Sequence, residues 1–433
     1  MKGWKRGDKR KIGRKRFLAG AMCVCMTLCA GCQAAGTQDG GFVRRRESGV
    51  VISVLAGQST SDAGVEDMIN ETAAEKFPEL QIEWECVDWG DKFASQMQGR
   101  IASGEIPDLI VGKAQDVVPY AKSGALEPLS IEGIETVEDT ALESVSLDGK
   151  VYGVPYNAWY QGVLYHKEIF EAYGLKAPET REELEEIVSV LEKNGEIPFA
   201  SHFQETWNVG NMTMQFMIGD IFGKEDDWGE RFRRGETGFS GNDRMRDCFE
   251  QNRYILEHSF SDAMMIDQYE SDKRFVEGEA AMYLTGAWSL QALEQYGWDG
   301  EYGIFPYPNQ TGDAALIRET NMTFMIGKNS PYQEEVGRIL EELLKNEKLM
   351  REILDFTQTD SVVCGIEASG KNDVADDAAY YEARNRIIDA TVGNGQLVWS
   401  FQNQIAENTR RWLNGEMELE EVFREADNDR NNS

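Results

Sequence analysis

Apolar runs and amphipathic stretches alternate along the chain after residue 48. A nearly continuous apolar run at 49–55 predicts a strand buried on both faces, and further strands are predicted at 81–87 and, again buried, at 107–112. The stretches 61–77 and 91–103 between them carry apolar side chains at helical spacing, and a short helix ended by Gly124 follows the third run. This order of strands and helices predicts an α/β sheet with helices on its faces.

The segment 148–166 joins this unit to a second one. Asp148-Gly149 is a tight-turn signal, and the alternation after it predicts an extended segment that continues into a strand at 161–165. Aromatic rings crowd the junction around Trp159. Such rings have apolar faces and polar edges, which suits a cleft between two lobes. The alternative, two buried strands of one sheet with Trp159 in the core, stays open.

The second unit repeats the alternation. A helix at 167–173 ends at Gly174, and the capping box Thr180-Arg-Glu-Glu183 begins another that runs to Leu191. Gly286 permits a turn that presents Trp288 at the end of a strand. Further strands are expected at 197–200, 280–284, 302–308 and 323–326, and further helices at 333–346 and 398–413.

The first 31 residues predict a secretory signal. A basic head precedes the apolar run 17–28, which is too short to span a membrane stably. The next residues, Ala30-Gly31-Cys32, resemble the bacterial lipoprotein box, which implies a lipid anchor on Cys32. An ordinary cleaved signal with an incidental cysteine is the alternative. Residues 33–48 are polar and predict a flexible tether.

Charge and cysteine content narrow the range of ligands. The net charge of −32 becomes about −40 once residues 1–31 are removed, which disfavours nucleic acid and anionic lipid headgroups as partners. The expected ligand is therefore neutral or cationic. Of the seven cysteines, only Cys86, Cys248 and Cys364 remain beyond Cys32, and three widely spaced thiols form neither a disulfide framework nor a zinc site.

Several motifs follow one another through most of the mature chain, at 149–155, 164–170 with 174–175 and Thr180, 275–288 and 302–306. Together and in this order they resemble the family 1 extracellular solute-binding proteins, the maltose-binding-like receptors of ABC importers. His166 stands where that family usually has Asn, and Arg181 where it often has Trp.

The resemblance implies a two-lobe α/β fold of the periplasmic-binding-protein type (type II), with a mixed sheet in each lobe and a hinge between the lobes. Both lobes would be discontinuous. The expected division is a signal at 1–31, a tether at 32–48, the N-lobe at 49–158 and 313–360, and the C-lobe at 159–312 and 361–433.

The resemblance also implies which residues bind a mono- or oligosaccharide. Sheets of this kind bind ligands beyond the carboxyl ends of their strands, and two loops leave those ends, at 57–60 and 112–116. Either loop could instead be solvated and without function. The candidate ligand residues are Gln58, Ser59, Gln115, Asp116, Trp159, Trp207, Trp288 and Trp399. Aromatic planes and rim amides or carboxylates suit the apolar faces and hydroxyls of a pyranose.

The expected function is the lipid-anchored binding component of an ABC importer, which delivers sugar to membrane permeases as a monomer without cofactor or metal. Nucleic acid is not an expected partner. Two alternatives remain: a receptor that signals to a membrane kinase, and a secreted glycoside hydrolase or lyase, which would need two carboxyl groups across the scissile bond. The sequence lacks the common hydrolase and metalloprotease motifs, and its histidines at 166, 202 and 258 are scattered.

Overall fold

Two β-sheets organise the protein in the computed structural model, which describes residues 49–57, 63–89, 91–298, 300–369, 374–390 and 396–433. The first sheet has the strand order β2-β1-β3-β12-β6. Strand β1 lies between β2 and β3 and is parallel to both, whereas β12 is antiparallel to both of its neighbours. The strands are β1 (Val50–Gly57), β2 (Leu80–Val87), β3 (Leu109–Lys113), β6 (Val154–Pro155) and β12 (Met322–Ile326).

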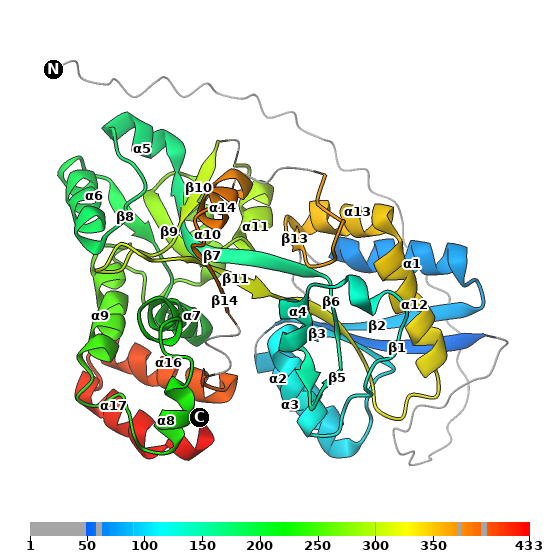
Figure 1. Cartoon of the computed structure of the whole chain (residues 1–433). Coiled ribbons are helices and arrows are strands. Elements are labelled where there is room, and N and C mark those ends of the chain that lie inside the picture. Colours follow the sequence, from blue (N-terminus) through cyan, green and yellow to red (C-terminus); the bar gives the residue numbers. More distant parts are fainter. Residues whose placement is uncertain (1–48, 58–62, 90, 299, 370–373, 391–395) are drawn as a thin grey trace, which may run out of the picture. The chain divides into compact units, whose positions relative to one another are not determined.

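Helices cover both faces of the first sheet (Figure 1). The pleat sends alternate side chains to opposite cores: Val54 packs with α1, α12 and α13, while its neighbour Leu55 packs with α2 and α3. Ile110 of β3 and Met325 of β12 share the core of Leu55. The helices are α1 (Ala63–Lys76), α2 (Asp91–Ser103), α3 (Ala114–Lys122), α4 (Asp139–Ser144), α12 (Gln333–Lys345) and α13 (Glu347–Thr357).

The second sheet is built around β7, the ten-residue strand that follows the crossover. The strand order is β14-β11-β7-β9-β8, and β10 and β13 also pair with β7. All four partners of β7 are antiparallel to it, and β8 is parallel to β9. The strands are β7 (Asn157–His166), β8 (Ile197–Ala200), β9 (Ala280–Gly286), β10 (Tyr302–Phe305), β11 (Leu316–Thr320), β13 (Asp360–Ser361) and β14 (Ile387–Asp389).

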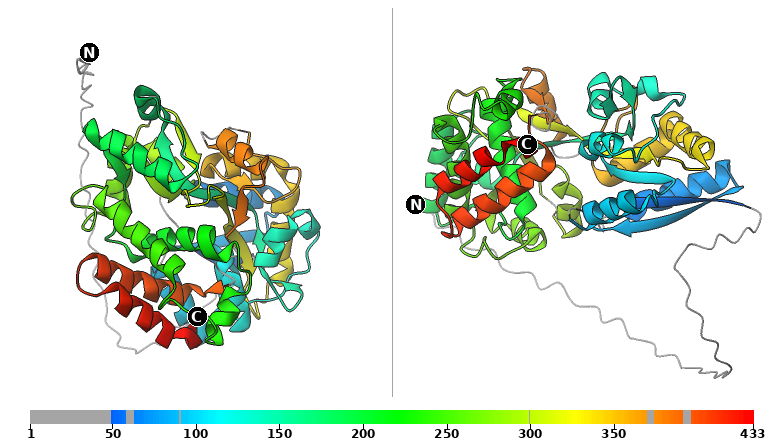
Figure 2. Two further views of the ribbon diagram at one scale, coloured as in Figure 1. Left: turned by 60° about the vertical axis from the view of Figure 1, so that its left-hand side comes forward. Right: turned by 90° about the horizontal axis from the view of Figure 1, so that it is seen from below.

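Helices from distant parts of the sequence pack around the second sheet. Figure 2 shows α16 and α17, near the C-terminus, beside α7 and α9, and the rings of Phe249 on α9 and Phe423 on α17 lie 5.0 Å apart. The helices are α5 (Lys167–Tyr173), α6 (Arg181–Lys193), α7 (Thr206–Met217), α8 (Trp228–Arg233), α9 (Asp243–Glu257), α10 (Gln268–Val276), α11 (Ser289–Gln295), α14 (Ala375–Glu382), α16 (Trp399–Leu413) and α17 (Leu419–Asn428).

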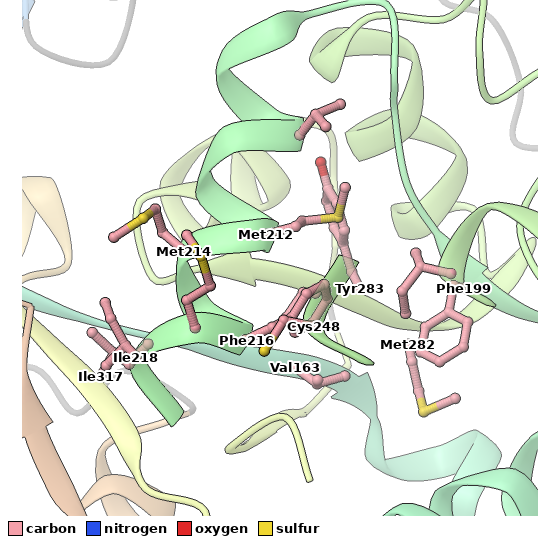
Figure 3. Packing of buried hydrophobic residues seen from close by; sticks show 14 of the residues in the cluster. Val163, Phe199, Met212, Met214, Phe216, Ile218, Cys248, Met282, Tyr283 and Ile317 are labelled. Atoms are coloured by element: carbon pink, nitrogen blue, oxygen red, sulfur yellow. The ribbon is translucent and has the colours of Figure 1, made fainter. Parts of the chain in front are cut away.

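The hydrophobic core around the second sheet includes side chains that lie between α7 and this sheet. Figure 3 shows Met212 and Phe216 of α7 among buried side chains that include Tyr283 of β9 and Val163 of β7. Met212 is fully buried, so the methionines of this helix serve as core residues. Arg181 is also buried and forms ion pairs with Asp220 and Asp247, at 3.5 and 3.1 Å.

The chain passes between the two sheets three times: after β6, between β11 and β12, and before β13. The sequence placed residues 313–360 with the N-lobe, but β11 pairs with β7 in the second sheet. The return to the first sheet therefore lies between Thr320 and Met322. The other lobe boundaries remain a prediction.

Candidate ligand-binding site

The candidate site lies at the passage between the sheets and is built on a row of side chains across β9, β7 and β11. Glu319 of β11 pairs directly with Trp159 of β7. On the other side of β7, Gln161 pairs with Gly286, the last residue of β9. Because paired residues and residues two apart on a strand share a face, Glu319, Trp159 and Gln161 lie on one face of the sheet. Trp288 follows in the turn between β9 and α11, where its ring contacts that of Trp159.

The two indoles of this row contact each other. Trp159 and Trp288 meet edge to face, with ring centroids 5.2 Å apart, and both are half-buried. Gly286 makes this possible, because a Cβ atom at that position would come 2.0 Å from Cζ3 of Trp288. The Nε1 atom of Trp288 is buried and has no hydrogen-bond partner among the described residues. The two rings together offer apolar surface with an unused polar edge.

Glu319 is the polar centre of the row. Its Oε2 atom accepts hydrogen bonds from Nε1 of Trp159, at 3.0 Å, and from Nε2 of Gln161, at 2.5 Å. The side chain of Gln161 is held in turn, because its Oε1 atom accepts from Nδ2 of Asn211 on α7, at 3.1 Å. Burial raises the pKa of Glu319, while the charge of Lys113 and these two donors oppose the rise.

The first sheet contributes Lys113 and Asp116 to the same place. Lys113 ends β3, and Asp116 lies in the first turn of α3. Burial raises the pKa of Asp116 to about 6; the charge of Lys113 opposes this rise and that of Glu319 adds to it. The charge of Glu319, on the second sheet, therefore reaches Asp116, on the helix that follows β3 of the first sheet.

The expected loop at 112–116 is not a loop, and this prediction was wrong. Strand β3 runs through Lys113 and α3 begins at Ala114, whose N–H donates to the carbonyl oxygen of Asn321, at 2.7 Å. Gln115 and Asp116 consequently stand on a helix. The prediction failed because Lys113-Ala-Gln-Asp116 is polar without a glycine or a capping residue, so its sequence shows no helix start.

Other candidates lie elsewhere or outside the described residues. Trp207 is on α7, where its Nε1 atom donates to Oε1 of Glu205, at 3.2 Å, and its ring lies 5.4 Å from that of His202. No ring contact or hydrogen bond within the described part of the chain joins Trp207 to the row. Trp399 begins α16. Gln58, Ser59 and the anchor residue Cys32 fall outside the described residues.

Sequence reasoning missed Glu319, Lys113 and Asn211 as members of the site. Asn321 was missed as well; it follows β11, only 1 % of its side chain is exposed, and neither polar atom of its amide has a partner among the described residues. The unexpected strand β11 carries Glu319 and leads into Asn321. The stretch Arg318-Glu-Thr-Asn321 has no apolar pattern, so only its pairing with β7 reveals it as part of the site.

Within the described ranges, no group of three or more His, Cys, Asp or Glu side chains is arranged to hold a metal ion. Nor does any helix in those ranges combine the length and apolarity that a membrane span requires. The expectations of no metal and no cofactor stay predictions.

Comparison with known proteins defines the family. The family described as bacterial extracellular solute-binding protein matches residues 56–349. The chain therefore belongs to this family, and it is an extracytoplasmic solute-binding protein with the two-lobe α/β fold expected from its sequence.

Relatives and solved structures are similar over most of their length. The multiple sugar-binding protein of Streptococcus mutans is 22% identical over 374 residues, which cover 82% of this chain and 83% of the relative. The galactooligosaccharide-binding protein of Bacillus subtilis is 22% identical over 341 residues, with 75% and 77% covered. The structure of SBP RafE in complex with raffinose aligns with a TM-score of 0.74 at 19% identity, covering 88% of this chain and 99% of that one.

Proposed function

We propose that this protein captures a mono- or oligosaccharide between its two lobes and delivers it to the permease subunits of an ABC importer. The observation that carries the proposal is the row of Trp288, Trp159 and Glu319, where two indoles stand beside a carboxylate held by fixed donors. Aromatic planes suit the apolar faces of a pyranose, and the carboxylate accepts from its hydroxyls. The sugar-binding names of the relatives support the same ligand class.

The mechanism follows from the position of the row at the passage between the sheets. Trp159 and Glu319 belong to the second sheet, and Trp288 lies in the turn that follows β9. Lys113 ends β3 of the first sheet, and Asp116 lies on α3, which follows that strand. A sugar that touches both groups binds the closed arrangement of the lobes better than the open one, and only such a difference shifts the equilibrium towards closure. The closed form would then dock on the permeases, with the protein held at the membrane by a lipid on Cys32.

Thermal unfolding against a sugar panel tests this proposal. Protein comprising residues 33–433 would be heated with raffinose, galactobiose, xylobiose, chitobiose and the common monosaccharides. A ligand present at 100 times its dissociation constant should add about 2.7 kcal/mol to the free energy of unfolding. A rise in the unfolding midpoint with some of these sugars supports the proposal. No shift with any of them would contradict it.

The enzyme alternative has one observation in its favour. Asp116 and Glu319 are two carboxyl groups, the charge of Glu319 acts on Asp116, and burial raises the pKa of Asp116 to about 6, as a general acid requires. We propose that these groups bind sugar without cleaving it. Chromatography of the same incubations decides the matter, because a hydrolase or lyase would release shorter products whereas a binding protein returns the sugar intact.

A further inference from the structure

Only one of the two carboxylate oxygens of Glu319 accepts hydrogen bonds from the described residues. Trp159 and Gln161 both donate to Oε2, while Oε1 has no hydrogen-bond partner among the described residues. A carboxylate can accept about four hydrogen bonds, so two acceptor positions on Oε1 remain. Glu319 is half-buried, so part of the residue is exposed.

The orientation of this carboxylate is fixed before any ligand arrives. Gln161 donates to Glu319 through Nε2 and accepts from Asn211 through Oε1. Asn211 accepts in turn from Nε2 of Gln215, at 2.8 Å, one turn further along α7. A chain of hydrogen bonds thus runs from the helix to Oε2. Such preorganisation reduces the ordering cost of binding, and it directs the Oε1 atom to one place.

Two residues near Glu319 also leave polar atoms without a partner. Asn321, two residues further along the chain, is 1 % exposed, and neither polar atom of its amide has a partner in the described part of the structure. The same holds for Nε1 of Trp288, whose ring contacts that of Trp159. Thr320 is left out of this set, because successive side chains of a strand point to opposite faces of the sheet. Buried polar atoms are seldom left unpaired in proteins, and a solute rich in hydroxyl groups supplies such partners.

The charged side chains near Glu319 favour a neutral ligand over an anionic one. The negative charge of Asp389 raises the pKa of Glu319, and that of Glu319 raises the pKa of Asp116. Lys113 is the cation that opposes both rises. A ligand carboxylate brought to Oε1 would meet like charge and could not donate a hydrogen bond in its ionised form. A hydroxyl at the same place can donate.

We propose that Glu319 contacts the bound sugar and sets its charge preference, accepting a hydrogen bond from a ligand hydroxyl through Oε1 and disfavouring uronic acids. This inference rests on the proposed function, since it concerns how the same site selects among sugars. Glu319 acts in two ways: Oε1 binds the ligand, and Oε2 holds the indole of Trp159 in place.

The test compares matched neutral and anionic sugars on the wild type and on Glu319→Gln. Galactobiose and digalacturonic acid differ in the oxidation state of C6, and cellobiose with cellobiouronic acid forms a second pair. Raffinose serves as a further neutral probe, and calorimetry gives each affinity. Replacing a charge-assisted hydrogen bond by a neutral one should weaken neutral-sugar binding about tenfold. The preference for the neutral member of a pair should fall about fivefold or more, because the like charge is gone.

The control is Glu196→Gln. Glu196 is also half-buried and accepts from an aromatic residue, the hydroxyl of Tyr173 at 2.6 Å, but it precedes β8, away from the row. This variant should bind like the wild type. If Glu319→Gln unfolds, Glu319→Asp keeps the charge and shortens the reach, and it should also weaken neutral-sugar binding while keeping the preference over uronates.

The outcomes separate the two proposals. If the wild type binds a neutral sugar and Glu319→Gln behaves like Glu196→Gln, the role of Glu319 is refuted while the proposed function stands. A wild type that binds uronic acids as well as their neutral partners also refutes it. If the wild type binds none of the neutral sugars, the proposed function fails and this inference fails with it.

Discussion

The indole of Trp288 is the side chain on which ligand affinity should depend most visibly. Its ring is half-buried, lies against Gly286 and meets Trp159 edge to face. Trp288→Ala should weaken sugar binding by about 2 kcal/mol, or about 30-fold, because it removes a stacking plane without opening a core. Titration of tryptophan fluorescence with raffinose and galactobiose measures this. Trp298→Ala, at another half-buried tryptophan, should lower stability and leave affinity unchanged; equal affinity loss in both variants would contradict the assignment.

Asp272 on α10 should make stability depend on pH. Only 1 % of it is exposed, and burial raises its pKa from 3.8 to about 8, a rise to which the nearby charge of Glu205 adds and which a hydrogen bond from Tyr283 opposes. The native state therefore binds the proton more tightly than the unfolded state. The resulting stabilisation is complete below pH 3.8 and is lost as the pH rises through about 8.

Urea unfolding between pH 5 and 8.5 checks this expectation. The wild type should lose roughly 2–5 kcal/mol across the range, and Asp272→Asn should flatten the profile because its amide never charges. Asp262→Asn is the control: its pKa is lowered chiefly by the hydrogen bond with Arg274, so its titration falls below this range and the slope of the wild type should persist. A steep profile in Asp272→Asn would show that another group is responsible.

At the scale of elements, the turn from β9 into α11 determines where the indole of Trp288 lies. A methyl group at Gly286 would overlap that ring, so Gly286→Ala should displace the indole, cost about 1–3 kcal/mol of stability and weaken sugar binding. Calorimetric affinity and the unfolding midpoint measure the two effects. Gly99→Ala in α2 is the contrasting variant: nothing lies within 4 Å of its added Cβ, and helix propensity should make it slightly stabilising. Unchanged affinity in Gly286→Ala would remove this turn from the site.

Local sequence signals correctly predicted a turn and several helix ends. Asp148 and Gly149 have φ angles of 52° and 72°, which matches the tight turn, and the capping box of Thr180 and Glu183 begins α6 as expected. Gly174 ends α5 in the left-handed conformation. Each of these depends on a few neighbouring residues, so sequence reasoning reaches them.

Elements that depend on distant partners were not predictable. Strands β11, β13 and β14 have at most five residues each, and β11 forms a strand because it pairs with β7. Two residues of the row, Trp159 and Trp288, were therefore predicted from the sequence, because they lie near recognisable strand ends. Glu319 was not predicted, because only its pairing opposite Trp159 places it in the site. The aromatic residues around Trp159 are also only partly exposed, because Tyr156 and Tyr160 are buried in the cores.

At the scale of the whole molecule, Asn157 ties together the three places where the chain changes sheets. Its Oδ1 atom accepts from the N–H of Met322, at 2.9 Å, and its Nδ2 atom donates to the hydroxyl of Thr359, at 3.1 Å. Its carbonyl oxygen also accepts from the N–H of Asn321, at 3.0 Å. The side chain is 1 % exposed, so water does not replace these bonds if they are lost.

Asn157→Ala should therefore act on the connection between lobes as well as on stability. Leaving the Met322 N–H and the Thr359 hydroxyl without this partner should cost about 2–4 kcal/mol of unfolding free energy. Weakening these connections between the two sheets should also change how sugar binding shifts the equilibrium between lobe arrangements. The affinity for raffinose and galactobiose should therefore change, although Asn157 itself does not contact the ligand. Asn194→Ala, at an exposed amide that bonds within the end of α6, should alter neither quantity by more than about 0.5 kcal/mol. Lower stability with unchanged affinity in Asn157→Ala would show that the connections between the two sheets stabilise the fold but do not control the movement of the lobes.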